Sequence, residues 1–562
     1  MKRWVEIRGA EWRSAVVAVL LRLGLSLGLG LGLGLAACSS DAGGAPPIVI
    51  QSGTLLSLDD GQIQGAVAGM SRRFLGIPFA RPPVGDLRWK APVENEPWTG
   101  VRDATTFGGR CAQNATIQSM PSEDEDCLYL NVWTPDPAPA SPLPVMLWFH
   151  GGGNTAGSAS DDVPLGVGGL FYDGQALAER YGVVVVTTNY RLGPLGFFDH
   201  PALVAAGAPP GNQGLLDQRR AMEWVRDHIG AFGGDPGNVT IFGESAGSFD
   251  VCFHVASPGS AGLFHRAISE SGGCTTRMPT RSESEAGAAA FASAMGCDGA
   301  ASVPACLRAK SVADLLVDAP IVGGPASPLP GGDLYQGGTP LWDHGPIVDG
   351  DVLPDQPRAL FDAGHVAKVP YILGSNTDEG TLFHFGSIPV ADEAAYRAAL
   401  GRRFDTALVD AIVALYPVSG FASADAALQR VTGDFGLVCP TLDSARRAAA
   451  AGSTVRMYNF DFPIPIAGLE FLGAAHGAEI AFVFDSVDAD PQATLGELMR
   501  GDWTRFAATG DPNGGGTLAW PPFTAASDRR LELATTPQVL EDFRGDECAL
   551  WRTVYDQDFA SH

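Results

Sequence analysis

Basic residues are scarce in this 562-residue chain. Lysine and arginine together number 37, against 63 aspartates and glutamates, which gives a formal net charge of −26. A chain with this balance has no electrostatic basis for holding a polyphosphate, so we do not expect it to bind nucleic acid. The acidic excess suits a soluble exported protein, or one that attracts cationic substrates.

Motifs for cofactors are also missing. The sequence has no Walker loop, no dinucleotide fingerprint and no zinc-type spacing of cysteine and histidine. We therefore expect neither a metal site nor an organic cofactor. Hydrophobic residues make up 45% of the chain, which is enough for a large globular core.

The chain starts with basic residues, which the apolar Leu/Gly run Leu23–Leu35 follows. This run is shorter than the ~20 residues that cross a bilayer, so a transmembrane anchor is the weaker interpretation. Residues 1–37 therefore resemble an export signal, and Leu35-Ala36-Ala37-Cys38 resembles a bacterial lipobox in which Cys38 is lipidated. Residues 38–47 would then be a flexible tether and 48–562 the folded domain. We expect a lipoprotein at the outer face of a bacterial membrane, or a secreted protein if the signal is ordinary and Cys38 incidental.

The cysteine count agrees with export. Eight of the nine cysteines follow Cys38, and an even number in an oxidising compartment favours disulfides. The sequence alone does not give their pairing.

Apolar runs alternate with helical patterns from residue 48 onward. Helical spacing recurs within Gly214–Ile229, and the runs between such stretches are bounded by glycine, proline or polar residues, as strands buried on both faces are. This alternation predicts an α/β fold with a mostly parallel sheet, whose ligands bind beyond the carboxyl ends of the strands. The four clearest runs are Val145–His150, Val183–Asn189, Val239–Phe242 and Val369–Leu373.

The run Val239–Phe242 leads into Gly243-Glu244-Ser245-Ala246-Gly247, followed by the helix-compatible Ser248–Val255. In a strand–turn–helix context, this pentapeptide lifts the serine hydroxyl above the sheet, and glycines on both sides relieve the close backbone contacts. We interpret Ser245 as a nucleophile; the alternative is a merely structural turn.

A serine needs a histidine to accept its proton and a carboxylate to orient that histidine. Hydrolases with this turn have the chain order serine, acid, histidine. The strand Val369–Leu373 runs into a loop that holds Asp378 and Glu379, two candidates for the acid. Of the histidines beyond them, His384 is too close in sequence and His562 is terminal, so His476 is the predicted base.

A tetrahedral intermediate also needs N–H donors for its negative oxygen. The glycines of His150-Gly151-Gly152-Gly153 follow the run Val145–His150 and can offer them, because residues without side chains let the backbone approach a substrate.

Together these features resemble the type-B carboxylesterase/lipase family, and the resemblance covers essentially all of the predicted mature chain. It implies an α/β-hydrolase fold with large loop insertions that form an active-site gorge. It also implies a small-molecule ester substrate, Ser245 as nucleophile, Glu379 rather than Asp378 as acid and His476 as base. The oxyanion donors would be the N–H groups of Gly152, Gly153 and Ala246. Further matching segments are Phe74–Ala80, Pro82–Gly85, Arg88–Trp89, Glu125–Val132, Asn189–Gly193, Gly211–Gln218 and Phe232–Pro236.

The resemblance also implies a disulfide pattern: Cys111 with Cys127, Cys297 with Cys306, and Cys439 with Cys548. Cys252 and Cys274 match no pair common to the family, so they form either an extra bridge or two buried thiols. Arg88 and Glu125 resemble a structural salt bridge of the family.

Departures from the family bear on the substrate. The loop between Cys111 and Cys127 contains no tryptophan, the residue with which cholinesterases hold a quaternary ammonium, so a choline ester is not the expected substrate. The Gly/Pro-rich stretch Ile321–Thr339 does not reveal the pockets for the acyl and alcohol groups. Two alternatives remain open: a lipase for longer-chain glycerides, and a non-catalytic adhesion protein like the neuroligins.

Overall fold

The computed structural model describes nine stretches of the chain. The predicted signal and tether, with Cys38, lie outside them, as does Ile321–Thr339. The described residues are 48–116, 119–162, 170–316, 345–464, 466, 468–486, 493–515, 518–524 and 526–560.

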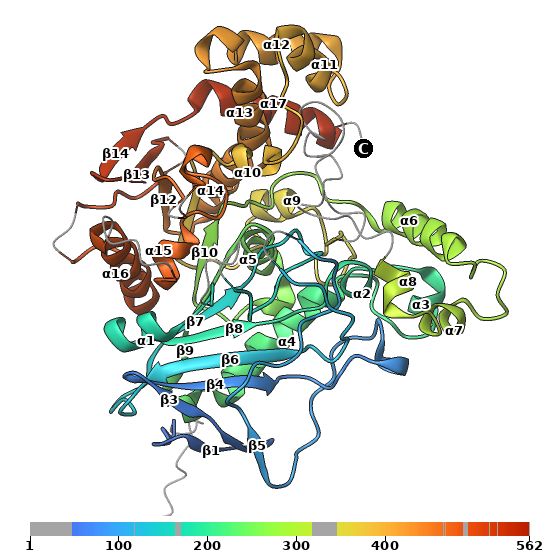
Figure 1. Ribbon diagram of the computed structural model, residues 1–562, viewed down its shortest axis with the longest axis vertical. Coiled ribbons are helices and arrows are strands. Elements are labelled where there is room, and N and C mark those ends of the chain that lie inside the picture. The colour runs from blue at the N-terminus through green and yellow to red at the C-terminus, as the bar shows by residue number, and fades with distance from the viewer. Residues whose placement is uncertain are drawn as a thin grey trace, which may run out of the picture. The chain divides into compact units, whose positions relative to one another are not determined.

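A mixed eleven-stranded sheet crosses the described domain (Figure 1). Its seven consecutive strands β8-β7-β9-β10-β11-β12-β13 run parallel, and antiparallel strands extend both edges. This confirms the expected mostly parallel sheet. In chain order the strands are β3 (Ala66–Ala68), β4 (Ser71–Pro78), β6 (Tyr129–Pro135), β7 (Leu143–Phe149), β8 (Val184–Thr188), β9 (Gly234–Glu244), β10 (Arg266–Glu270), β11 (Tyr371–Asn376), β12 (Val455–Phe460), β13 (Arg529–Leu533) and β14 (Gln538–Glu541). A separate small sheet joins β1 (Leu55–Leu58), β2 (Gly61–Gln64) and β5 (Val101–Asp103).

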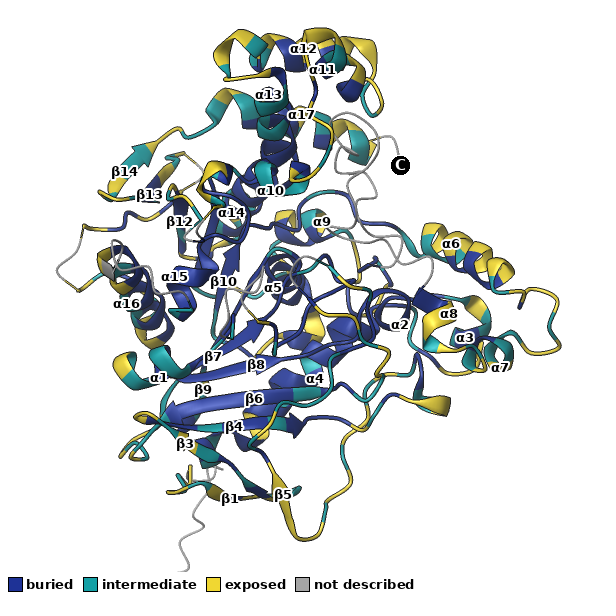
Figure 2. Cartoon of the chain, viewed as in Figure 1, coloured by how far each residue is buried: buried dark blue, intermediate teal, exposed yellow. Residues whose placement is uncertain are grey.

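Both faces of the parallel strands are buried, as their continuous apolar sequences require (Figure 2). Along β7, Val145 and Leu147 join one core cluster while Met146 and Trp148 join another, because successive side chains of a strand point to opposite faces. The first cluster includes residues of α4 (Gln213–His228), α5 (Ala246–Ala256) and α14 (Cys439–Ala451); the second includes residues of α1 (Gln175–Tyr181), α15 (Ile480–Phe484) and α16 (Ala493–Thr509). Helices therefore cover the sheet on both sides.

The other helices contribute residues to the first core cluster or to a third one. A third core cluster, with Trp89 and Phe291, packs α2 (Gly193–Gly196), α3 (Pro201–Ala205), α6 (Arg281–Ala294), α7 (Val303–Arg308) and α8 (Val312–Leu316), most of which stand together at the right of Figure 1. The remaining helices are α9 (Pro357–Asp362), α10 (Gly380–His384), α11 (Glu393–Leu400), α12 (Thr406–Leu415), α13 (Ala424–Gly433) and α17 (Gly545–Ala560).

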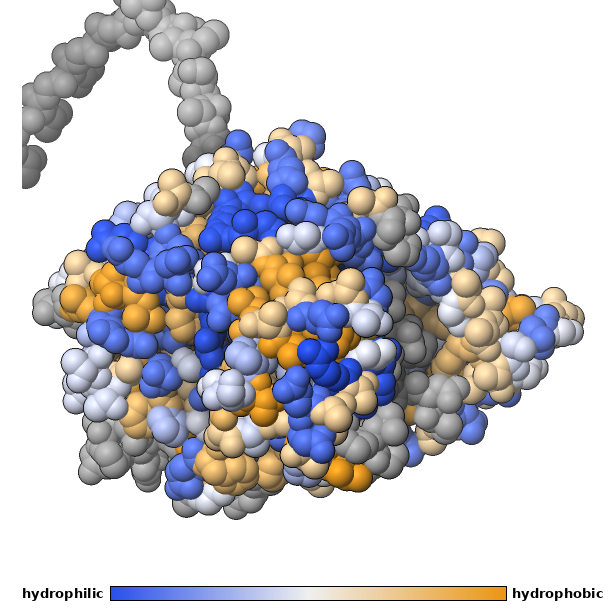
Figure 3. Space-filling model, turned by 90° about the horizontal axis from the view of Figure 1, so that it is seen from above, coloured by the Kyte–Doolittle hydropathy of each residue, from blue (hydrophilic) through white to orange (hydrophobic). Residues whose placement is uncertain are grey.

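The surface mixes polar and apolar groups on a fine scale. On the face in Figure 3, hydrophobic residues form small patches separated by hydrophilic ones. Among the described residues, none of the helices combines the length and hydrophobicity needed to cross a bilayer.

All eight cysteines of the described chain are joined in disulfides. The structure has the three bridges implied by the family resemblance, and it also joins Cys252 of α5 to Cys274 beyond β10. The two buried thiols considered as an alternative are therefore not present.

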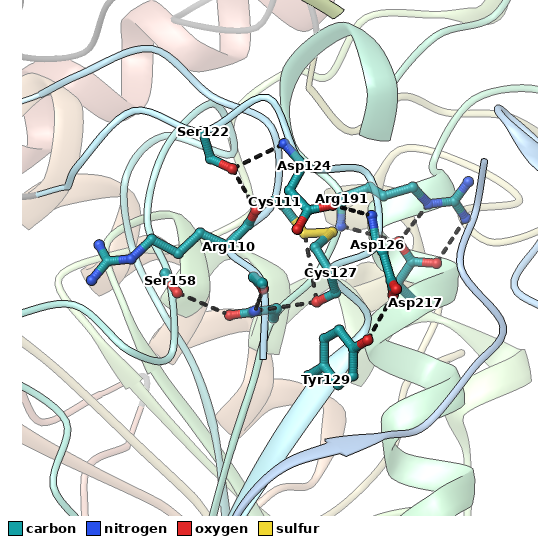
Figure 4. The surroundings of a disulfide bond; sticks show 12 residues. Arg110, Cys111, Ser122, Asp124, Asp126, Cys127, Tyr129, Ser158, Arg191 and Asp217 are labelled. Atoms are coloured by element: carbon teal, nitrogen blue, oxygen red, sulfur yellow. Dashed lines mark hydrogen bonds and ion pairs between the residues drawn. A yellow bond between two sulfur atoms is a disulfide. The ribbon is translucent and has the colours of Figure 1, made fainter. Parts of the chain in front are cut away.

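The first disulfide lies among segments that carry the family resemblance (Figure 4). Close to it, Arg191 donates from Nε and Nη2 to the two carboxylate oxygens of Asp217, each over 2.7 Å. Two segments matched to the family, Asn189–Gly193 and Gly211–Gln218, thus meet in one buried ion pair. Arg88 and the partly buried Glu125 form another ion pair, with Nε 2.7 Å from Oε2.

Candidate active site

Ser245 occupies a sharp turn between β9 and α5. Its backbone has φ 56° and ψ −123°, a left-handed conformation that side chains rarely adopt. Glycine on both sides makes the turn possible: a methyl group built on Gly247 would lie 2.0 Å from the carbonyl oxygen of Phe149, and one on Gly243 would lie 2.7 Å from the same atom. Ser245 is partly exposed, whereas its neighbours in the turn are buried.

The glycine loop after β7 lies beside this turn. A methyl group built on Gly151 would come within 3.1 Å of Ser245 Cβ. Gly152 and Gly153 have φ of 105° and 63°, and among the described residues no protein acceptor takes the N–H of either glycine or of Ala246. The three N–H groups are therefore available to a substrate.

Glu379 and His476 meet at the carboxyl end of the sheet. Oε2 of Glu379 lies 2.6 Å from Nδ1 of His476, and both side chains are buried. Their segments are joined: Asp378 pairs with Ala475 in a parallel bridge, and Asn376 donates to the carbonyl oxygen of Ala475 over 2.8 Å.

The side chains of the other candidates for acid and base have different partners. Asp378 forms an ion pair with Arg430, with 3.2 Å between Nη2 and Oδ1, and His384 hydrogen-bonds the hydroxyl of Thr432. The structure therefore brings Glu379 rather than Asp378 to the histidine. His562 lies outside the described residues.

The second nitrogen of the imidazole faces a carboxylate that sequence reasoning missed. Nε2 of His476 lies 3.2 Å from Oε1 of Glu244, the residue before Ser245. In the described part of the chain no hydrogen bond joins His476 to the Ser245 hydroxyl. A proton transfer between them requires the two groups to come within hydrogen-bond distance, and catalytic hydrogen bonds often form only when substrate is bound.

Two further glutamates, Glu270 and Glu479, lie near this pair and are fully buried. Glu479 accepts a hydrogen bond from Ser271 Oγ, and Glu270 accepts one of 2.8 Å from Trp503 Nε1. Burial raises the pKa of Glu244 to about 8 and that of Glu479 to about 7, and it raises the pKa of Glu270 well above its ordinary value.

Burial acts on the pKa of the histidine in the opposite direction, whereas the surrounding carboxylates raise it. Burial lowers the pKa of His476, but the charges of Glu244 and Glu379 and the hydrogen bond to Glu379 raise it to about 9. Glu244 and His476 therefore each keep a proton to higher pH than the isolated side chains would. The sequence places two of these carboxylates near predicted site residues: Glu244 is inside the pentapeptide, and Glu479 comes three residues after His476. Glu270 has no such neighbour.

Chains that present a serine on such a turn, above the carboxyl ends of a parallel sheet, form the α/β-hydrolase class, and this fold is one of them. The chain belongs to the carboxylesterase family, whose model matches residues 52–551. It is 34% identical to an acetylcholinesterase from Bungarus fasciatus over 544 residues, which cover 89% of this chain and 85% of the relative. It is 33% identical to a cholinesterase from Mus musculus over 551 residues, with coverages of 89% and 87%. The protein is thus a serine hydrolase of carboxylic esters.

Proposed function

We propose that the protein is a carboxylesterase that acts through an acyl-enzyme. Ser245 attacks the ester carbonyl, His476 takes the hydroxyl proton and then gives it to the leaving alcohol, and Glu379 holds the imidazole in the useful tautomer. Water activated by His476 then releases the acid. The observation that carries the proposal is the 2.6 Å contact between Glu379 and His476, both of which lie beyond β-strands of the sheet that presents Ser245.

The oxyanion assignment is part of the same proposal. The N–H groups of Gly152, Gly153 and Ala246 would bind the negative oxygen of the tetrahedral intermediate. Their lack of protein acceptors and the contact between Gly151 and Ser245 support this role.

The reaction can be tested with a fluorophosphonate, which should label Ser245 stoichiometrically. Ser248→Ala is a matched control, because Ser248 lies on the same helix and its hydroxyl is bound to the carbonyl oxygen of Gly272. Ser248→Ala should keep the label and Ser245→Ala should lose it. Label on another residue, or full hydrolysis of p-nitrophenyl acetate by Ser245→Ala, would contradict the proposal. A wild-type protein that neither takes the label nor hydrolyses the ester would favour a non-catalytic adhesion role.

We propose neutral esters as substrates, although the two relatives are named for cholinesterase activity. A quaternary ammonium is held best by an open tryptophan face. Of the eight tryptophans among the described residues, seven are buried in the core, and Trp98 lies near Arg102 in the small sheet. None of these eight is positioned to receive a choline group beside Ser245.

A lipase is the second candidate. Large apolar side chains are exposed close in sequence to the acid and to the base: Phe385, after Glu379, and Phe471, before His476, are 41% and 71% exposed, and their rings lie 6.2 Å apart. Such a pair could contact a long acyl chain. The rates on p-nitrophenyl acetate, octanoate and palmitate distinguish the candidates, since a carboxylesterase loses activity on the long chain and a lipase gains it, above all on an emulsion.

We also propose that Cys38 is lipidated and holds the enzyme at the outer face of a bacterial membrane. The support is the sequence Leu35-Ala36-Ala37-Cys38. Cys38→Ala should give an unprocessed or soluble protein without the acyl modification. Mass spectrometry that finds a mature N-terminus elsewhere and no lipid would refute this anchor.

A further inference from the structure

Asp250 is a fully buried carboxylate on α5 that the proposed reaction does not use. Among the described residues it has no lysine or arginine partner. Two amides bind it instead: Asn154 Nδ2 donates to Oδ1 over 3.0 Å and Gln218 Nε2 donates to Oδ2 over 2.6 Å. Burial raises the pKa of Asp250 to about 7, and these two hydrogen bonds act against that rise.

A buried chain of hydrogen bonds fixes the direction of the second amide. Gln218 Oε1 lies 2.9 Å from His254 Nε2, and His254 Nδ1 lies 2.8 Å from Ser260 Oγ. Burial lowers the pKa of His254 to about 3, so its ring is neutral and has one donor and one acceptor. Because the amide group of Gln218 faces Asp250, its oxygen faces the ring, which must donate from Nε2 and accept from Ser260. Every donor in this chain points toward Asp250.

The other partner belongs to the glycine loop. Asn154 directly follows Gly153, is fully buried and has a left-handed φ of 56°. Its carbonyl oxygen accepts from the N–H of Gly193 over 2.7 Å, and its side chain binds Asp250. The residue that ends the glycine run is therefore fixed from two sides.

Asp250 also stands one helical turn after Ala246, so the two residues lie on the same side of α5. Asp250 thus connects the two parts of the proposed oxyanion hole: the loop that carries Gly152 and Gly153, and the helix end that carries Ala246. Three N–H groups can stabilise one oxygen only if loop and helix keep a fixed spacing.

We propose that Asp250 is a positioning residue for ester hydrolysis: through Asn154 it holds the glycine loop against α5, so that the three N–H groups converge on the oxyanion. This inference rests on the proposed function. It concerns the transition state and not the binding of the ester, because the oxyanion exists only after attack.

An exchange of the two side chains tests the proposal. Asn154→Asp places a second buried carboxylate against that of Asp250. We expect kcat to fall by about 100-fold, as it does when one oxyanion donor is lost, while KM changes by less than about threefold. Asp250→Asn should be milder, since the unpaired buried Oδ1 of Asn154 can turn to accept from the new amide. The double variant Asn154→Asp/Asp250→Asn restores one carboxylate opposite one amide and should recover kcat to within about tenfold of the wild type.

Inhibition by a trifluoromethyl ketone gives a readout that a merely structural role would not move. Its adduct with the serine places an oxyanion in the hole, so its Ki should rise across the variants in proportion to the loss of kcat/KM. Asp199→Asn is a matched control, because Asp199 is a buried carboxylate whose ion-pair partner is Arg281 on α6. It should alter the melting temperature without altering the ratio of kcat to Ki.

Two results would overturn the proposal: additive losses in the double variant, or unchanged kcat in a folded Asn154→Asp. If Asn154→Asp does not fold, Asn154→Ser, whose hydroxyl is too short to reach Asp250, should show the same selective loss of kcat, and normal kcat there overturns the proposal equally. Failure of the proposed function is separate, since it shows as absent fluorophosphonate labelling of Ser245 in the wild type.

Discussion

Nε2 of His476 lies 3.2 Å from Oε1 of Glu244, the residue that directly precedes Ser245. The nitrogen that must accept the serine proton thus faces a carboxylate. A negative charge at this distance favours the imidazolium, which cannot act as a base.

This contact predicts the pH dependence of the reaction. His476 must be neutral to accept a proton, so kcat/KM should rise with pH as the imidazolium loses its proton, and the raised pKa places this rise at higher pH than for an isolated histidine. Glu244→Gln removes a charge that raises this pKa, so the acid limb should move to lower pH by on the order of one unit. The pH profile of kcat/KM gives the measurement.

Glu470, an exposed glutamate shortly before His476 in sequence, offers the control. Glu470→Gln should leave the acid limb of the pH profile in place. The position of the limb is the readout, since Glu244→Gln can also change the maximal rate. A limb that stays in place or moves to higher pH in Glu244→Gln would show that Glu244 does not control the base.

The triad should behave as one unit. Ser245→Ala or His476→Ala alone should lower kcat by on the order of 10⁴-fold or more, and the double variant should lose little further, because neither residue works without the other. Glu379→Gln should lower kcat by less than either, since an orienting residue leaves the nucleophile and base in place. Single-turnover kinetics on p-nitrophenyl acetate measure these losses. A Ser245→Ala variant with a tenth of wild-type turnover, in protein free of host esterases, would disprove the nucleophile.

Choline esters should gain little over neutral esters of equal size. No tryptophan lies between Cys111 and Cys127, so the chain lacks a cation–π contact there. Such a contact is worth about 2 kcal/mol when desolvated, or about 30-fold in rate. The comparison is between acetylthiocholine and 3,3-dimethylbutyl thioacetate, at low and high salt. We expect a modest preference that salt weakens, since only the acidic surroundings favour the cation. A preference above about 100-fold that persists in high salt would contradict this expectation.

The long-range disulfide should stabilise the fold more than the short one. Cys439 and Cys548 are 109 residues apart in sequence, and Cys297 and Cys306 are 9 apart. In the chain-entropy model the larger loop contributes roughly 5 kcal/mol and the smaller roughly 2.5 kcal/mol to the free energy of unfolding. Replacing each pair by alanines and measuring urea unfolding compares them directly. Equal losses would show that loop length does not decide the contribution here.

The interior of the sheet was predictable from the sequence. The four predicted strands correspond to β7, β8, β9 and β11, because strands buried on both faces leave continuous apolar runs. The boundary of β9 was less accurate: the strand begins at Gly234, while its polar, Gly/Pro-containing first residues gave no apolar signal before Val239. The edge strand β14 and its neighbour β13 were not predicted, since short and partly exposed strands carry little pattern.

The site divides in the same way. The strand–turn–helix around Ser245 and the position of His476 followed from local motifs and chain order. The choice between Asp378 and Glu379 did not, because both follow β11; in the structure the bridge from Asp378 to Ala475 decides which side chain faces the ring. The carboxylates of Glu244, Glu270 and Glu479 come together only through packing, which no local spacing records.

The bridge between Asp378 and Ala475 has a consequence for dynamics. The N–H of Asp378 donates to the carbonyl oxygen of Ala474 over 2.9 Å, and the Asp378 carboxylate accepts from the N–H of Ala474. The segments that carry Glu379 and His476 are therefore fastened to each other independently of the turn that carries Ser245. In hydrogen–deuterium exchange the amides of Asp378 and Ala474 should open in a single event, so that a local fluctuation removes acid and base from the nucleophile together and restores them together.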